Sequence, residues 1–533
     1  MSGGMRVLGE VPFEGLQMPD IFLSYIGRDP ALERFLPPRP ASLAELLQAS
    51  AERLAYTGCE PFRQELAALL REDAERQGAK APVMEAIDRL SRPGTLAIVT
   101  GQQPGLFGGP LYTWHKVATA LRLATELGRF DGSPDLVTIF WNHSDDHDWG
   151  EANHSFLVNS GLDLQRIRLG MPQTGRPLFD IPAGELLSAA ISDARDLLPA
   201  TEFREAELEL LEPRSPQETL GTHLTRQLSA HFEEEGLLVL DSSLLGRGFR
   251  EVLLGFHERA AELRGVLKTT VTELADFGLE VNLDPEGPFL FQIEPHGRRS
   301  PVPDGQVCPS GHLPSPGVLF RNLWQDRVLP VLAFVSGPGE ISYLAAAGGL
   351  YASLGLPRPP IVPRASLTHV GRRLAGYLER WGLGLADLDQ GPGNVETWIA
   401  EREGGRHEET EQGRLPEEAL RELAAELRRR LRDLEAEVAR VDRNLLLPLA
   451  RLESRTRSEL GKLAEKLARQ RRNRAGTWRQ HARRLCAELR PRGRFQERVL
   501  PALPFLVRAG PAFAKELVAV ADPFAPAHLL VSE

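Results

Sequence analysis

The densest group of residues that could do chemistry lies between Trp141 and His154. These fourteen residues include three histidines, three aspartates and one glutamate. Carboxylates so close together raise one another's pKa unless they are solvated, paired or bound to a ligand. Two functional interpretations are open: His and Asp side chains ligate a divalent metal, or they act as a general base and as contacts to a ribose or an amine. A solvated acidic turn is the structural alternative.

A glycine-rich segment from Gly101 to Lys116 has the features of an anion-binding loop. Glycines let the backbone approach a ligand closely, and the helix that follows begins with unpaired N–H groups. The segment is neither a Walker loop nor a dinucleotide fingerprint. Its last part, Pro110 to His115, is similar to the P-x-x-x-x-H end of the signature of nucleotide-adenylating enzymes, in which the histidine contacts ATP phosphates. A tight turn with a capping histidine is the structural alternative.

Two further polar turns follow apolar runs. One contains Asp241 and Ser242, and the other extends from Ser336 to Tyr343. In the second turn, Glu340 falls in the first turn of a helix, where an acidic residue complements the helix dipole. Glu340 is therefore either a structural residue or a contact to the amine of a substrate.

These polar segments each follow a short apolar run that we interpret as a strand. The runs cover residues 96–99, 136–141, 237–240 and 328–335, and helical periodicity follows each of them. Strands that alternate with helices are typical of an α/β fold with a parallel sheet. Ligands of such sheets bind outside the carboxyl ends of the strands. The sequence therefore predicts that the four polar turns converge on one site.

A different pattern begins near residue 416. Apolar residues recur at alternating steps of three and four from Leu420 to Leu445 and again from Leu449 to Leu467, which is typical of a coiled coil. Asp442-Arg-Asn444, shortly before Pro448, favours a turn and an antiparallel helical hairpin. Because the apolar seam is larger than a lone hairpin readily covers, we expect a homodimer.

Composition excludes several classes of protein. The 533 residues carry a net charge of -10, which argues against a general nucleic-acid binder. Cys59, Cys308 and Cys486 form no CxxC pair, so neither a disulfide framework nor a thiolate zinc site is encoded. The N-terminus has no signal-peptide core, and no stretch approaches the roughly 20 apolar residues of a membrane span. We expect a cytoplasmic protein without a membrane or nucleic-acid partner.

Three segments taken together resemble the bacillithiol synthase family, the cysteine ligases of bacillithiol biosynthesis. They are TGQQPGLFGGPLYTWHK (100–116), FWNHSDDHDWGEANH (140–154) and VLPVLAFVSGPGEISY (328–343). The resemblance continues through Ser315 to Arg321, Gln325-Asp326, the hairpin and residues 485–526, and so spans nearly the whole chain. The sequence departs from the family at residues 142–145, where the family more often has small residues and a glutamate, whereas Asp146-His-Asp148 matches.

The resemblance implies a Rossmann-like core similar to the catalytic fold of class I aminoacyl-tRNA synthetases and cysteine ligases, together with a coiled coil that dimerises. On this basis the core covers residues 1–370, with inserted segments at about 160–235 and 278–326. A helical coiled-coil domain covers 371–495, and a C-terminal segment over 496–533 packs back on the core.

The implied reaction joins L-cysteine by an amide bond to the glucosamine amine of glucosaminyl malate. A carboxylate and an amine do not condense in water without activation, so we expect ATP or another nucleotide as a cosubstrate. A requirement for Mg²⁺ is left open, and no permanently bound metal is expected. The leaving group needs cationic and N–H stabilisation, for which His115, Lys116 and the turn Gly101-Gln102-Gln103 are the candidates.

Under the same resemblance, Asp146, His147 and Asp148 hold the amines and accept the proton released on attack, and Glu340 pairs with an ammonium. The other residues predicted to bind substrate or nucleotide are Tyr112, Asn142, Asp145, Glu151, His154, Asp241, Ser242 and Gly337. Two alternatives of other classes stay open. One is a coiled-coil scaffold that binds a nucleotide without catalysis, and the other is a metal-dependent hydrolase built on the His/Asp loop.

Overall fold

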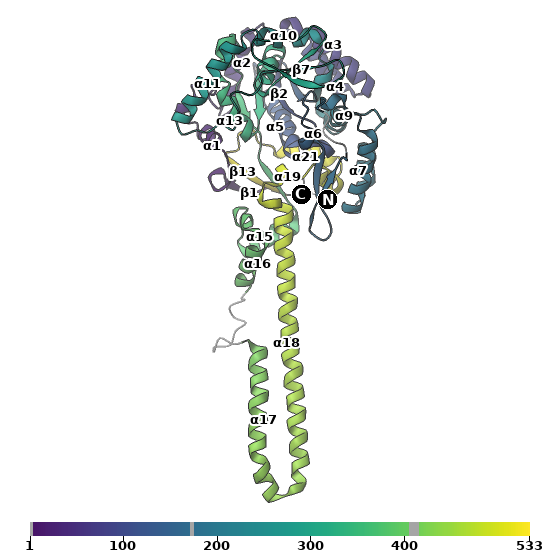
Figure 1. The fold of residues 1–533 in the computed structure, drawn as a ribbon, viewed down its shortest axis with the longest axis vertical. Helices are drawn as coiled ribbons and strands as arrows, with labels where there is room; N and C mark the ends of the chain where they lie inside the picture. Colours follow the sequence, from purple (N-terminus) through teal and green to yellow (C-terminus); the bar gives the residue numbers. More distant parts are fainter. Residues whose placement is uncertain (1–3, 171–174, 404–414, 533) are drawn as a thin grey trace. The chain divides into compact units, whose positions relative to one another are not determined.

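The structure, a computed structural model, describes residues 4–170, 175–403 and 415–532. Residues 171–174 of the first predicted insert and residues 404–414 of the predicted helical domain lie outside the described residues. The chain forms two compact units, which Figure 1 shows as ribbons. One consists of Met1–Arg372 and Arg494–Glu533, and the other of Arg373–Gly493.

A parallel sheet of five strands, in the order β11-β10-β2-β3-β6, lies at the centre of the first unit. Its strands are β2 (Leu96–Gln102), β3 (Leu136–Asn142), β6 (Leu238–Asp241), β10 (Val331–Ser336) and β11 (Ile361–Pro363). Four of them are the predicted apolar runs, so the predicted α/β fold is confirmed. The strand β10 begins later than the run at 328, because Val328 still belongs to the preceding helix. The strand β11 was missed, since three residues behind the proline-rich stretch 357–360 give no periodic signal.

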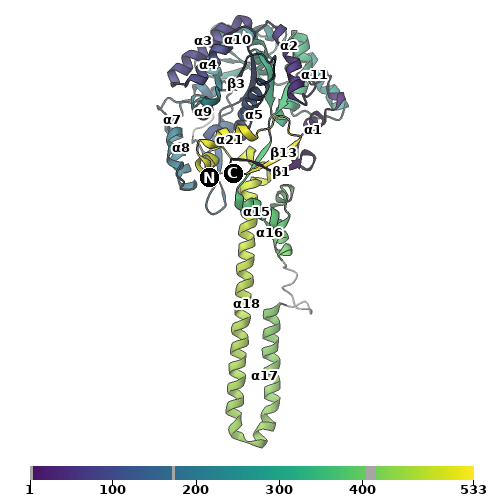
Figure 2. The ribbon, with the colours of Figure 1, turned by 180° about the vertical axis from the view of Figure 1, so that it is seen from behind.

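Helices cover both faces of this sheet (Figures 1 and 2). Ala97 and Val99 of β2 share a core cluster with residues of α3 (Glu60–Gln77) and α4 (Ala81–Leu90). Leu96 and Ile98 point the other way and share a cluster with α2 (Leu43–Ala55) and α5 (Tyr112–Leu127). Because alternate residues are buried on opposite faces, the strands are continuously apolar rather than alternating.

Two segments interrupt the succession of strands and helices. The first contains the antiparallel pair β4 (His154–Val158) and β5 (Leu164–Arg168), followed by α7 (Gly184–Leu197), α8 (Arg204–Leu211) and α9 (Leu220–Phe232). The second forms the antiparallel sheet β8-β7-β9, made of β7 (Leu290–Ile293), β8 (Arg299–Val302) and β9 (Leu313–Pro316). The helix α12 (Val318–Val328) follows directly, so the predicted second insert ends within a helix.

The C-terminal residues complete the first unit. The strand β13 (Ala527–Ser532) lies between β1 (Val7–Pro12) and β12 (Leu367–Val370). Before it come α19 (Gln496–Val499), α20 (Leu503–Ala509) and α21 (Ala512–Val520). Other α-helices of this unit are α1 (Asp20–Ile26), α6 (Trp149–Ala152), α10 (Arg247–His257), α11 (Ala260–Asp276), α13 (Pro338–Ala346) and α14 (Gly348–Leu354).

The second unit is helical. It contains α15 (Arg372–Trp381), α16 (Gly391–Arg402) and the pair α17 (Pro416–Val441) and α18 (Leu446–Leu489), which pack along each other as the predicted hairpin. The turn falls where predicted, and the Asp442 carboxylate accepts the N–H of Asn444 at 2.8 Å. Pro448 lies in the first turn of α18, where its missing N–H breaks no helical bond. In the described part of the chain, no helix has the length and apolar content needed to cross a membrane.

Candidate active site

The carboxyl ends of the parallel strands lie side by side, as predicted. Gln102 at the end of β2 is in register with Asn142 of β3, and Asn142 is in register with Asp241 of β6. A cavity of about 600 Å³ opens beside this edge. Its size falls within the range of small-molecule sites, which is roughly 300–1,000 Å³.

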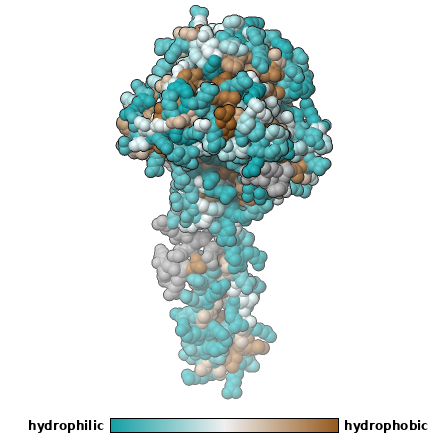
Figure 3. All heavy atoms as spheres, turned by 45° about the horizontal axis from the view of Figure 1, so that its top comes forward, coloured by the Kyte–Doolittle hydropathy of each residue, from teal (hydrophilic) through white to brown (hydrophobic). Residues whose placement is uncertain are grey.

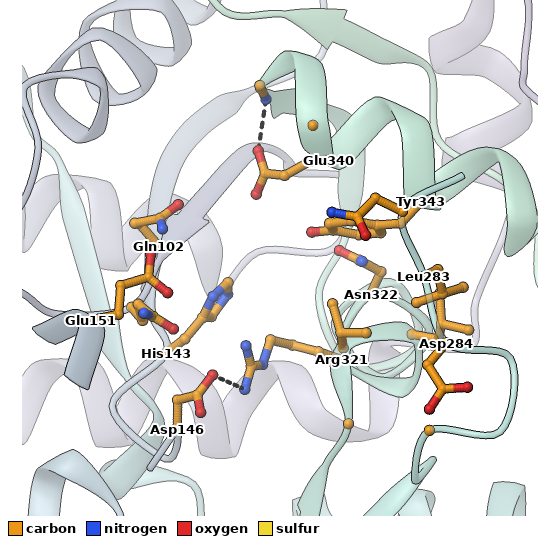
Figure 4. A pocket seen from close by; sticks show the side chains of 18 of the residues that line it. Gln102, His143, Asp146, Glu151, Leu283, Asp284, Arg321, Asn322, Glu340 and Tyr343 are labelled. Carbon is orange, nitrogen blue, oxygen red and sulfur yellow. Dashed lines mark hydrogen bonds and ion pairs between the residues drawn. The ribbon is translucent and has the colours of Figure 1, made fainter. Parts of the chain in front are cut away.

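Nine predicted site residues line this cavity, four of which are labelled in Figure 4. They are Gln102, Gln103, Tyr112, Lys116, Asp146, His147, Glu151, Gly337 and Glu340. The rest of the wall comes from the second inserted segment, the start of α12 and the residues after β10. Segments separated by more than 200 residues therefore meet at one site.

Lys116 is the buried cation of the cavity. Its ammonium lies 2.6 Å from the Glu340 carboxylate and donates to the carbonyl of Gly101 at 2.8 Å and to Gln102 Oε1 at 3.0 Å. Burial lowers the pKa of Lys116, and the Glu340 carboxylate opposes that shift. Glu340 in turn accepts the N–H of Gly337 at 2.6 Å. The ammonium that Glu340 contacts is thus one of the protein's own.

Gly101 allows this arrangement because no side chain fits there. A Cβ at this position would lie 2.6 Å from the carbonyl oxygen of Trp141 and 2.7 Å from Nε2 of His143. The missing side chain lets β2 pass close to the carbonyl of Trp141 and the ring of His143. Gly101 is not among the residues that line the cavity.

Asp146 and His147 lie beside two arginines from distant segments. Arg299 donates to Nδ1 of His147 at 2.6 Å, and Arg321 lies 3.5 Å from the Asp146 carboxylate. Burial alone would raise the pKa of Asp146, but the hydrogen bonds from His147 and the charges of Arg321 and Arg299 hold this pKa well below its usual range.

The same two arginines affect whether the loop can bind a divalent metal ion. Asp146 faces two guanidinium groups, at 3.5 Å and 3.7 Å, and such cationic neighbours disfavour a divalent cation. Within the residues that the structure describes, no three His, Cys, Asp or Glu side chains are grouped as metal ligands.

His115, predicted to contact phosphates, lies inside the protein and not in the cavity wall. It is fully buried, its Nδ1 donates to the Glu497 carboxylate at 2.8 Å, and its Nε2 lies 3.2 Å from Nε2 of His369. The reason is the phase of α5: His115 and Lys116 are one residue apart and so face about 100° apart around the helix. Only Lys116 faces the edge of the sheet.

Glu497 links this interior to the cavity. Its carboxylate accepts two hydrogen bonds from Arg364, at 2.6 Å and 2.9 Å, and the N–H of Leu367 at 3.1 Å. Burial opposes ionisation, but Arg364 and His115 hold the pKa of Glu497 well below its usual range. Arg364 lines the cavity. The C-terminal segment therefore positions a cation of the site.

Four other residues predicted to bind ligands are also interior. Asn142 donates to Asp241 at 2.9 Å and to the carbonyl of Gly221 at 2.8 Å, and Ser242 accepts the indole N–H of Trp141 at 2.9 Å. Asp145 accepts from Ser315 at 2.9 Å. Asn142, Asp145, Asp241 and Ser242 thus tie the strand ends to neighbouring segments instead of lining the cavity.

Two predicted residues of the acidic loop have local structural contacts. Asp148 is exposed and caps α6 by accepting the N–H of Glu151 at 3.0 Å. His154 at the start of β4 contacts the carbonyl of Gly150 at 3.1 Å. Neither lines the cavity.

Several cavity residues were not predicted. Arg321 and Tyr343 end two segments that carry the resemblance, but nothing in those segments indicated a role for them. Arg299 and Arg364 have no local motif around them, and their position follows from the fold alone. His143 lies within the acidic loop, where composition could have indicated it. Burial and the nearby charges of Arg321 and Lys116 lower its pKa well below the usual range, so the ring is neutral. Its Nε2 has no hydrogen-bond partner among the described residues.

Comparison with protein families gives matches along most of the chain. Residues 10–309 and 305–365 match the family described as "Bacillithiol biosynthesis BshC, N-terminal Rossmann-like domain". Residues 407–533 match the family described as "Bacillithiol biosynthesis BshC, C-terminal coiled-coil domain". These matches agree with the parallel-sheet core and the helical hairpin described above.

Curated relatives carry the name "Putative cysteine ligase BshC". The protein of Heliobacterium modesticaldum is 30% identical over 522 residues, which cover 91% of this chain and 93% of the relative. The protein of Koribacter versatilis is 28% identical over 553 residues and 98% of each chain. The protein of Chlorobaculum tepidum is 32% identical over 359 residues, 61% of this chain and 63% of that relative.

Proposed function

The chain belongs to the BshC family of bacillithiol biosynthesis, and on this premise we propose that it joins L-cysteine to the amine of glucosaminyl malate after nucleotide-dependent activation. The observation that carries the proposal is the buried ammonium of Lys116, held at the carboxyl edge of the sheet in a cavity lined by further cations. Such an edge is where α/β proteins bind anionic cosubstrates.

A nucleotide supplies the activation, because it converts the cysteine carboxylate into a mixed anhydride with phosphate. One carboxylate oxygen forms the new bond to phosphorus, and pyrophosphate or ADP leaves. The amine nitrogen then attacks the carbonyl carbon, and AMP or inorganic phosphate leaves with that oxygen. One proton is released from the amine.

The cationic side of the cavity is suited to hold phosphate oxygens. Lys116, Arg364 and Arg498 line it, and α13 begins beside them at Gly337 and Pro338. Cations and helix N-termini stabilise negative charge where it develops. Because Lys116 and Arg364 are fixed by Glu340 and Glu497, little reorganisation is needed when charge forms.

The acidic loop is suited to the amine of the acceptor. Glu151 lines the cavity, and the charges that act on it come from other carboxylates, so it provides negative charge for an ammonium. Asp146 of the same loop is paired with Arg299 and Arg321. Before attack the amine must lose a proton. The Glu151 carboxylate, which lines the cavity and whose pKa is raised by burial, is suited to accept it.

The direct test incubates the purified chain with L-cysteine, glucosaminyl malate and ATP. Amide product accompanied by loss of ATP to AMP or ADP supports the proposal, and the nucleotide product identifies the route. Binding of ATP without turnover would instead favour a scaffold. Turnover that chelators abolish without ATP loss would favour a metal-dependent hydrolase.

We also propose that the hairpin forms a homodimer. Leu423, Leu434, Leu452 and Leu463 of α17 and α18 are between 44% and 55% exposed in the single chain. Figure 3 shows such apolar side chains interrupting the hydrophilic surface of the hairpin. Light scattering should give twice the chain mass, and Leu423→Glu with Leu434→Glu should give the monomer. A wild-type monomer at micromolar concentration would contradict the dimer.

A further inference from the structure

Arg321, near the start of α12, lines the cavity with a guanidinium group that is not fully paired. Its Nε has no hydrogen-bond partner among the described residues, although the side chain is only 11% exposed. Its nearest carboxylate oxygens belong to Asp146 at 3.5 Å and Asp145 at 3.8 Å, which are long contacts. A buried guanidinium N–H without a partner is costly unless a ligand satisfies it.

Each guanidinium nitrogen of the two neighbouring arginines already has a partner. Arg250 donates through Nε, Nη1 and Nη2 to three backbone carbonyls, at 2.6 Å to 2.9 Å. Arg299 donates to the hydroxyl of Ser315, to His147 and to the carbonyl of Pro316. Within this group, the nitrogen without a partner among the described residues is therefore on Arg321, which lines the cavity.

Arg321 lies in a buried group of charged side chains. The carboxylates of Asp145 and Asp146 lie 3.5 Å to 3.9 Å from the three arginines, and the buried Asp241 also acts on Arg250. Because Arg321 has only long contacts to these carboxylates, a ligand carboxylate would make the short charge-assisted hydrogen bond that it lacks.

The start of α12 adds to this preference. Gly317, Val318 and Leu319 line the cavity beside Arg321. The first N–H groups of a helix have no partner within it and attract negative charge. Arg321 and the helix end therefore favour the same kind of ligand.

This anion site is separate from the proposed phosphate site. In Figure 4, Glu340, which pairs with Lys116, lies on the opposite side of the open cavity from Arg321 and Asp146. The acidic loop and Arg321 are adjacent, since Asp146 of this loop lies 3.5 Å from the guanidinium group of Arg321. An acceptor whose amine lies at this loop would place its own carboxylates near Arg321.

We propose that Arg321 and the first turn of α12 form a carboxylate-binding subsite that takes the malate moiety of the acceptor. This inference rests on the proposed function for the identity of the acceptor. The subsite itself is defined by Arg321 and can be tested without turnover. Its specificity is for a free carboxylate, since an ester or an amide provides no charged acceptor for the guanidinium group.

Titration calorimetry of the full chain with L-malate provides the test. We expect wild-type protein to bind malate and not its dimethyl ester. Arg321→Gln should weaken malate binding at least tenfold, whereas Arg298→Gln, an equal charge change at an exposed neighbouring arginine, should leave it unchanged. Arg321→Lys keeps the charge without the planar donors, so its affinity for malate should lie between that of wild type and that of Arg321→Gln.

Parallel titrations with L-cysteine and inorganic phosphate distinguish the other sources of an anion. If Arg321→Gln reduces binding of cysteine or phosphate and spares malate, the assignment to malate is wrong. Equal binding of malate and its dimethyl ester by wild-type protein would also overturn it, even if the variant does not fold. Failure to form the amide would count against the proposed function, whereas Arg321-dependent malate binding would still support the subsite.

Discussion

The ammonium of Lys116 and the carboxylate of Glu340 lie 2.6 Å apart and come from helices that follow adjacent parallel strands. The helix α5 follows β2, and α13 follows β10. The side chain of Lys116 is 2% exposed, so its charge is held at the edge of the sheet before any ligand binds. The fold thus fixes a cation at the position where we expect a phosphate to bind.

Replacing Lys116 should remove much of this stabilisation. We expect Lys116→Met to reduce the rate of amide formation by about 10²–10³, the usual loss when one group that stabilises transition-state charge is removed. Lys80→Met is the matched control, because Lys80 is exposed and pairs with Glu233 and Glu234. A Lys116→Met enzyme within twofold of wild type, with unchanged unfolding, would exclude the role.

The pH dependence should report the pairing with Glu340. Burial lowers the pKa of Lys116 and Glu340 opposes this, so Glu340→Gln should lower that pKa further. The cation is lost as pH rises through its pKa, and the alkaline limb of the rate profile should therefore move to lower pH in the variant. If the alkaline limb of the rate profile stays at the same pH in the variant, Lys116 is not the group whose titration produces it.

Substitutions of Asp146 and Asp148 in the acidic loop should differ in their effect on the rate of amide formation. Asp146 lines the cavity and holds two arginines, whereas Asp148 is exposed and caps α6. Asp146→Asn should reduce amide formation at least tenfold. Asp148→Asn should change it by less than about twofold, since Asn caps helices as well as Asp does. Equal losses for the two variants would contradict this distinction.

The buried pair of Glu497 and Arg364 should matter for stability. Glu497→Gln leaves a buried guanidinium without its counter-charge, so we expect a loss of about 3–5 kcal/mol in the free energy of unfolding. Glu273→Gln is the control, because the Arg34–Glu273 pair has the same 2.6 Å separation but is 48% and 41% exposed. Its loss should be below about 1 kcal/mol. Denaturant unfolding measures both, and similar losses would contradict the argument.

The sequence predicted the elements with strong periodicity. Continuous apolar runs indicated four parallel strands, and their polar ends indicated that the segments of Lys116 and Asp146 would line one site. Arg321 and Arg364 could not be predicted in this way. Arginine is common throughout the chain, and no shared local pattern marks the four that line the cavity, Arg299, Arg321, Arg364 and Arg498.

His115 shows a second limit of sequence reasoning. Periodicity indicated that a helix follows Gly101 to Pro110, but it did not decide whether His115 or Lys116 faces the strand ends. That phase depends on Glu497, more than 380 residues away, which accepts a hydrogen bond from His115 in the interior. The residues of the cavity are therefore set partly by contacts that no short motif contains.

The central claim is that a nucleotide activates the cysteine carboxylate, and oxygen-18 transfer tests it most directly. The enzyme would be given L-cysteine labelled with oxygen-18 in its carboxylate, together with ATP and glucosaminyl malate, and the products analysed by mass spectrometry. The account predicts that each amide formed places one labelled oxygen in AMP or inorganic phosphate. Amide formed without label in either product would contradict it.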